Sequence, residues 1–160
     1  MKGWRENDLE MERELVRRLD EVLLGNVAAT RWVLDMVYVA HLLDDLIDKD
    51  KARTDEEISR AFRILAVDMP ANPFHEQHRH ELRVLWTELF LHWSDATALE
   101  KSSDAHDRAM AWMLRAYLLR AIVHCAYLVG GPDHARSVGP TIQRWYEERV
   151  EDELKEAPHV

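Results

Sequence analysis

The sequence predicts an all-α protein, folded as a single domain of about six helices. Of its 160 residues, 47% are hydrophobic and 32% are charged, and only five are glycine and five proline, which is typical of a helical globular chain. Apolar residues recur at helical spacing along most of the sequence, without the alternating β-branched runs that indicate strands. The length suffices to bury a hydrophobic core, so we expect one domain over residues 1–160.

Three of the expected helices are bounded by residues with known capping preferences. Gly25 suits the end of the first helix, and Asn26 suits the N-cap of the second. Thr54 with Glu57 fits a capping box that opens the third helix. The helices are expected over residues 7–24, 27–49, 54–69, 76–100, 105–129 and 140–155.

The apolar pattern of each helix predicts which side is buried. Helices 27–49 and 105–129 are apolar nearly all round, which is typical of buried bundle helices, so we expect these two to be central. The third helix instead carries one apolar stripe, made of Ile58, Phe62 and Leu65. We expect that stripe to face the core.

The net charge and the cysteine content indicate which binding partners and which cellular compartment to expect. The formal net charge of −9 disfavours a broad contact with nucleic acid. Cys125 is the only cysteine, and the charged N-terminus lacks the apolar segment of a signal peptide. The apolar run 109–129 holds Arg115 and Arg120 near its middle, where charges are costly in lipid, so we expect no membrane span. These features predict a cytoplasmic protein.

An acidic cluster ends the second helix. Its members are His41, Asp44, Asp45 and Asp48. The C-terminal end of a helix carries partial negative charge, so aspartates there are disfavoured by about 0.3–1 kcal/mol each. A divalent cation would compensate, because carboxylate oxygens are the ligands that Mg²⁺ prefers. The alternative is a solvated helix end that Lys49, Lys51 and Arg53 neutralise.

A second polar stripe lies on helix 105–129. At about 100° per residue, this stripe contains Met113, Tyr117, Arg120, His124 and Tyr127. If it faces the acids of the second helix, Tyr117, Arg120 and His124 form the wall of a pocket that could bind a diphosphate. An unpaired guanidinium inside a bundle is costly, so we expect Arg120 and His124 to be buried and partnered.

Asp44-Asp45-Leu46-Ile47-Asp48 resembles the DDxxD motif of the trans-isoprenyl diphosphate synthases and the related terpene synthases. The resemblance implies that Asp44 and Asp48 bind Mg²⁺ with Asp45 in support, and that Arg53 helps to bind the diphosphate. It implies a Mg²⁺-dependent transferase or lyase that acts on prenyl diphosphates. The second aspartate-rich motif of these enzymes has no counterpart here. The resemblance is therefore also compatible with a reduced or inactive form of the fold, and whether the chain is an enzyme stays open.

Two other readings remain. One is a non-catalytic helical interaction protein, with a second copy of the chain as a candidate partner. The other is an all-α nucleotide pyrophosphohydrolase, which requires a second acidic helix to face Asp44 and Asp48. The residues that could supply it are Glu147, Glu148, Glu151 and Asp152. A weaker candidate for metal ligands is the set Glu88, His92 and Asp95 on one side of the fourth helix.

Overall fold

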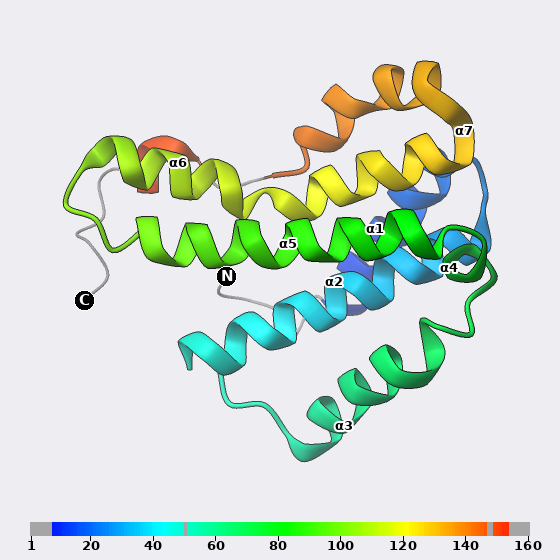
Figure 1. Cartoon of the computed structure of the whole chain (residues 1–160), viewed down its shortest axis with the longest axis horizontal. Helices are drawn as coiled ribbons and strands as arrows, with labels where there is room; N and C mark the ends of the chain where they lie inside the picture. The colour runs from blue at the N-terminus through cyan, green and yellow to red at the C-terminus, as the bar shows by residue number, and fades with distance from the viewer. Residues whose placement is uncertain (1–7, 50, 147–148, 154–160) are drawn as a thin grey trace. The chain divides into compact units, whose positions relative to one another are not determined.

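The computed structural model describes residues 8–49, 51–146 and 149–153, and within them every regular element is a helix. The predicted all-α class is therefore confirmed (Figure 1). The helices are α1 (Asp8–Val22), α2 (Val27–Asp48), α3 (Asp55–Arg63), the π-helix η1 (Ile64–Asp68), α4 (Pro73–Gln77), α5 (Arg79–Leu99), α6 (Ala105–Arg115), α7 (Tyr117–Gln143) and α8 (Val150–Glu153). They belong to two compact units, Met1–His78 and Arg79–Val160. The prediction of one domain stays a prediction.

In the first unit, α2 packs against α1, α3, η1 and α4. Asn26 caps α2 as predicted, because its side-chain oxygen accepts a hydrogen bond of 3.0 Å from the backbone N–H of Ala29. Trp32, Val33 and Met36 of α2 are fully buried. These large apolar side chains make α2 the core helix of its unit.

The short helix α4 is attached to α2 by polar contacts. The Asn72 amide donates a hydrogen bond of 2.9 Å to the carbonyl of Ala28, while its oxygen caps α4 at the N–H of Phe74. The Trp32 indole donates a hydrogen bond of 3.0 Å to Nδ1 of His75. Partial burial lowers the pKa of His75, which favours the neutral form that accepts this bond.

The segment α3–η1 begins with the predicted capping box, but the side that it buries differs from the expected one. Thr54 and Glu57 form the capping box. The expected inward stripe is wrong, because Phe62 is 70% and Leu65 45% exposed, whereas Ala61 and Ile64 are buried. The small Ala61 lets α3 approach closely, with Ile64 three residues further on the same side. The buried face is therefore offset by one residue from the expected stripe.

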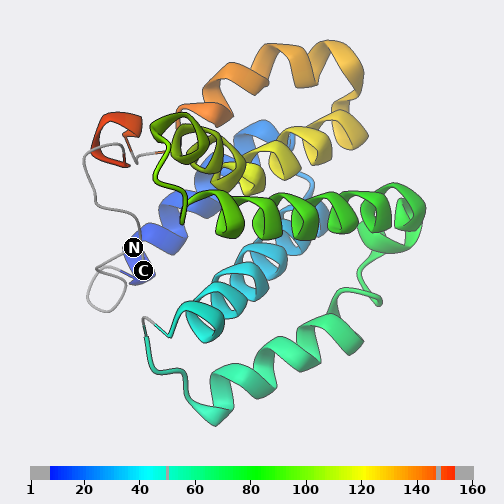
Figure 2. The ribbon, with the colours of Figure 1, turned by 60° about the vertical axis from the view of Figure 1, so that its left-hand side comes forward.

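In the second unit, α5 and α6 lie side by side and antiparallel (Figures 1 and 2). The buried stripe of α5 consists of Leu82, Leu89 and Ala96, at the seven-residue spacing of one helix face. Near the connection, the Arg115 guanidinium donates a hydrogen bond of 2.6 Å to Glu100. The single helix expected over 105–129 is wrong, because the backbone leaves helical geometry at Ala116 (φ −74°, ψ 12°) and α7 begins at Tyr117.

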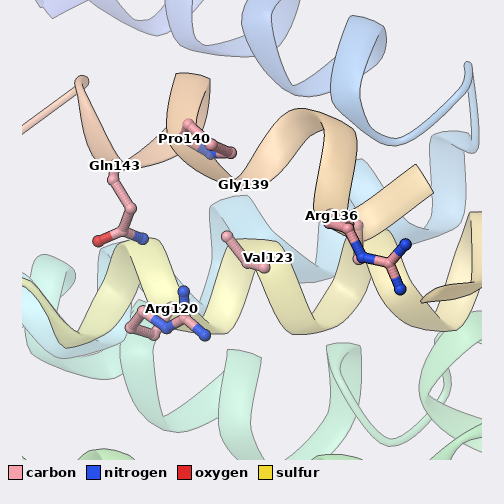
Figure 3. A pocket seen from close by; sticks show the side chains of 7 residues that line it. Arg120, Val123, Arg136, Gly139, Pro140 and Gln143 are labelled. Atoms are coloured by element: carbon pink, nitrogen blue, oxygen red, sulfur yellow. The ribbon is translucent and has the colours of Figure 1, made fainter. Parts of the chain in front are cut away.

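The helix α7 folds back on itself at Gly131, whose φ of 80° and ψ of −176° reverse the chain direction. The first arm, 117–130, ends at the sequence Gly130-Gly131-Pro132, next to the end expected at residue 129. The second arm, 132–143, was not expected. Among the described residues of the helix predicted over 140–155, positions 140–143 belong to this arm and 150–153 form α8. Figure 3 shows Val123 of the first arm beside Gly139 and Pro140 of the second.

One helical stretch of the described chain, Ala105–Gln143, is long and apolar enough to cross a membrane by length and composition alone. This observation is weak evidence, because the core helix of a soluble protein passes the same test. The expectation that the chain has no membrane span stays a prediction.

Candidate functional site

The acidic cluster lies where α2 leaves the core of its unit. Asp44 and Asp45 are half-buried, whereas Asp48 is exposed. The helix ends at Asp48, and Lys49 follows in the left-handed conformation with φ 58°. The final turn is therefore a partly solvated helix end, which lowers the electrostatic cost of its aspartates.

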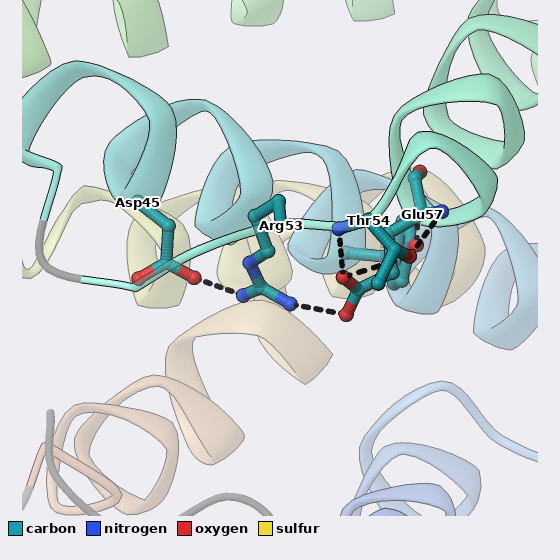
Figure 4. A network of polar contacts seen from close by, with 5 residues as sticks. Asp45, Arg53, Thr54 and Glu57 are labelled. Carbon is teal, nitrogen blue, oxygen red and sulfur yellow. Dashed lines mark hydrogen bonds and ion pairs between the residues drawn. The ribbon is translucent and has the colours of Figure 1, made fainter.

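Arg53 connects the cluster to the start of α3 (Figure 4). Its guanidinium donates hydrogen bonds to Asp45 and, at 2.9 Å, to Glu57, and its side chain is only 13% exposed. Burial by itself would lower the pKa of Arg53, but the bonds to Asp45 and Glu57 outweigh it and raise the pKa. Arg53 thus binds two carboxylates of its own chain, and one of them is the central aspartate of the DDxxD sequence.

Glu57 takes part in two contacts of this network. One carboxylate oxygen accepts the bond from Arg53, and the other accepts the backbone N–H of Thr54 at 2.8 Å. The Thr54 hydrogen bond is the main reason that the pKa of Glu57 is lowered; burial opposes it and Arg53 assists. The capping box therefore also positions the acid that binds Arg53.

His41 lies beside the acids on α2. Its burial lowers the pKa, and the negative charges of Asp44 and Asp45 partly counteract that effect. The net shift favours a neutral imidazole at pH 7, which is the form that can bind a metal. His41, Asp44 and Asp45 are thus electrostatically coupled at the end of one helix.

No metal centre is assembled in the described part of the chain, where no group of three or more His, Cys, Asp or Glu side chains is placed to hold an ion. The assignment of His41, Asp44, Asp45 and Asp48 to Mg²⁺ stays a prediction. Coordination by Asp45 would compete with Arg53 for the same carboxylate. The weaker candidate on α5 is open to solvent, with a contact of 4.0 Å between His92 and Glu88.

The second polar stripe belongs to the other unit, and the structure corrects part of it. Arg120 is exposed, so the expectation that it is buried is wrong, whereas Tyr117 is buried and His124 half-buried. The first arm of α7 buries its small and aliphatic residues Ala121, Ile122, Cys125 and Ala126 instead. The acids and this stripe belong to different units, so their facing stays a prediction.

The acidic segment that a pyrophosphohydrolase would require is only partly described. Glu147 and Glu148 lie outside the described residues, as does the side chain of Asp152. Glu151 is exposed and forms an ion pair of 3.5 Å with Arg149. This alternative therefore gains no support from the described residues.

The interpretation of a solvated helix end already had Arg53 neutralise the aspartates, but it named neither Asp45 nor Glu57 as the partner. Arg53 and Glu57 are four residues apart, the spacing at which opposite charges on a helix interact, so this half of the network had a sequence signal. The contact with Asp45 depends on how the loop after α2 turns back, and local spacing carries no signal for that.

Comparison with protein-family models, curated proteins and solved structures found no match to this chain. The likeness to the isoprenoid synthases therefore rests on the DDxxD residues themselves.

Proposed function

We propose that this chain is a non-catalytic, self-associating helical protein and that the segment α3–η1 forms the interface between two copies. The observation that carries the proposal is the exposure of Phe62, which is 70% accessible, together with that of Leu65 three residues later. Residues three apart are neighbours on a helix surface, so the two form one apolar patch.

Exposed apolar side chains of this size suggest a binding surface when they are grouped. Full burial of a Phe or Leu side chain stabilises a complex by about 1.5–3 kcal/mol relative to exposure. Val67, which is also exposed, extends the apolar character of the segment into η1. Grouped apolar residues of this kind are typical of interaction sites.

The charges of α3 favour a second copy as the partner. Its first turn carries Asp55, Glu56 and Glu57, and its last turn carries Arg60 and Arg63. A two-fold axis would pair α3 with its antiparallel copy, so that the acids of each helix meet the arginines of the other. The net charge of −9 opposes association, but charges farther apart than about 8 Å are largely screened at physiological salt.

The Arg53 network supports the non-catalytic part of the proposal. Asp45 and Glu57 share the Arg53 guanidinium, so part of the acidic cluster already has a counter-charge within the chain. This is the arrangement that a solvated, neutralised helix end requires.

Analytical ultracentrifugation tests self-association directly. The wild type should sediment as a reversible dimer, and Phe62→Ser and Leu65→Ser should weaken that dimer by on the order of tenfold or more each. Phe90→Ser is the matched control, because Phe90 is a half-exposed aromatic residue on α5. A wild type that stays monomeric at high concentration, or equal weakening by the control, would contradict the proposal.

A Mg²⁺-dependent diphosphate-binding role of isoprenoid-synthase type is our second candidate. The coupling of Asp44 and Asp45 to His41 favours it, because a metal site needs its ligands grouped at one place. If the site exists, Mg²⁺ with inorganic or prenyl diphosphate should raise the melting temperature of the wild type. At about 100 times the dissociation constant, the gain is roughly 2.7 kcal/mol.

Two variants decide this second candidate. Asp44→Asn and Asp48→Asn should lose the Mg²⁺ response, while their metal-free stability stays equal to that of the wild type or rises by some tenths of a kcal/mol. Identical shifts in the wild type and both variants would remove the metal site.

A further inference from the structure

We propose that the hollow between the two arms of α7 binds a small molecule through an oxyanion, either a phosphate or a carboxylate. The hollow measures about 390 Å³, within the range of roughly 300–1,000 Å³ that is common for small-molecule sites. It is lined by Arg120, Val123, Ala135, Arg136, Gly139, Pro140 and Gln143 (Figure 3). The proposal is independent of the self-association proposed above.

The reversal at Gly131 creates the hollow. It brings Arg120 and Val123 of the first arm against residues of the second arm. Gly139 is buried, and a Cβ built on it would lie 3.9 Å from a methyl carbon of Val123. The two arms thus approach closely at Gly139.

Gln143 supplies a hydrogen-bond donor that the fold leaves unused. Its amide nitrogen is buried and has no hydrogen-bond partner in the described structure. A buried donor without an acceptor is unfavourable, and such groups are rare in native proteins. Gln143 lines the hollow, so an oxygen atom of a ligand would satisfy this donor once the amide group turns toward it.

Two arginines give the hollow a positive lining. Within the residues that the structure describes, Arg120 has no ion-pair or hydrogen-bond partner. Arg136 contacts Asp133 at 3.1 Å, but both side chains are largely exposed, so the pair is weak and can be displaced. No acidic side chain lines the hollow. Guanidinium groups bind carboxylates and phosphates through paired hydrogen bonds, which makes an oxyanion the matching ligand.

The remaining lining residues indicate what else the ligand carries. Val123, Ala135 and Pro140 are apolar, and proline has no N–H to donate. An aliphatic or aromatic portion would pack on these residues while the oxyanion contacts Arg120, which lies near Gln143 in Figure 3. The chain's net negative charge acts at longer range and is screened by salt.

Isothermal titration calorimetry on the full chain tests the site. Inorganic phosphate is titrated in one experiment and succinate in a second. Arg120→Gln and Gln143→Leu should each weaken binding by on the order of tenfold or more, because each removes a hydrogen bond to a charged ligand. Arg83→Gln is the control, since it removes the same charge from an exposed position on α5. The oxyanion bound more tightly identifies the ligand class.

The same experiments can overturn the proposal. Absence of binding at millimolar phosphate and succinate would do so, as would equal weakening by Arg120→Gln and Arg83→Gln, which indicates general charge attraction. Circular dichroism checks that Gln143→Leu remains folded, and Arg120→Gln alters an exposed side chain. Neither variant should change the sedimentation of the chain, which separates this site from the α3–η1 interface.

Discussion

Arg53 and Arg120 are both arginines beside apolar helix segments, but the fold surrounds them in opposite ways. Arg53 is nearly enclosed and donates hydrogen bonds to two carboxylates. Arg120 is exposed at the edge of a hollow that no acidic side chain lines. From the sequence we expected both to bind a diphosphate, with Arg53 as an alternative counter-charge of the aspartates.

The difference shows that an arginine's partners within the fold decide whether its guanidinium group can bind a ligand. A guanidinium that already bonds two carboxylates stabilises its own chain and must be released before it can bind a ligand. An exposed guanidinium without an acidic neighbour adds little to stability but remains free for an anion. Arg53 is thus a structural residue and Arg120 a candidate binding residue.

The largest expected effect is a difference between two matched substitutions. Arg53→Met should lower the free energy of unfolding by about 1–3 kcal/mol, because it leaves two partly buried carboxylates without their cation. Arg120→Met should change it by less than about 0.5 kcal/mol, as is usual for surface positions. Urea denaturation measures both, and equal losses would remove the distinction between the two arginines.

A smaller loss is expected when the cap that positions Glu57 is removed. Thr54→Ala deletes the side-chain oxygen that accepts the N–H of Glu57, which should cost about 1 kcal/mol. Thr87→Ala is the control, because the Thr87 hydroxyl contacts only a carbonyl within α5; it should leave stability unchanged or slightly higher. Thermal unfolding measures both losses. A larger loss of stability in Thr87→Ala than in Thr54→Ala would contradict the role of the cap.

The contact between Asp45 and Arg53 should appear as a coupling energy. In a double-mutant cycle of Asp45→Asn and Arg53→Met, we expect the two losses to be non-additive by about 0.5–1 kcal/mol. Asp45→Asn combined with Arg17→Met should be additive, since Arg17 bonds Glu14 and Glu21 instead. Additivity in both cycles would show that the Arg53 network contributes nothing as a unit.

The smallest expected effect is a pH dependence. The pKa of Glu57 in the folded chain lies below its ordinary value of 4.5, mainly because the ionised carboxylate accepts the Thr54 N–H. The contribution of Glu57 to stability is therefore complete above about pH 5.5 and is lost as the pH falls through 4.5 toward the folded pKa. Glu57→Gln should flatten this part of the stability profile, and an unchanged slope would contradict the assignment.

Local chemistry made much of the fold predictable from sequence. Asn26 and the Thr54–Glu57 pair cap their helices as expected, because capping depends on residues within one turn. The reversal at Gly131 occurs at a Gly-Gly-Pro sequence, which is typical of the end of a helix. By contrast, the break at Ala116 has no glycine or proline to mark it, so periodicity merged α6 with α7.

The orientation of side chains was harder to predict, because it depends on tertiary packing. Phe62 and Leu65 form a regular apolar stripe, but α3 packs through Ala61 and Ile64 instead. Arg120 lies on a nearly all-apolar helix and is nevertheless exposed. The grouping of His41, Asp44 and Asp45 follows from their spacing along one helix, whereas their binding of a metal stays a prediction.

The backbone conformation at Gly131 makes the hollow in α7 depend on the chirality of the residue at this position. Its φ of 80° and ψ of −176° belong to a region that essentially only glycine occupies among natural residues. The mirror image of this conformation is ordinary extended backbone, so a D-alanine introduced here by chemical synthesis should fit and restrict the unfolded chain, whereas L-alanine should strain the turn. Any natural substitution at this one achiral position would therefore disturb a pocket whose lining residues all remain present.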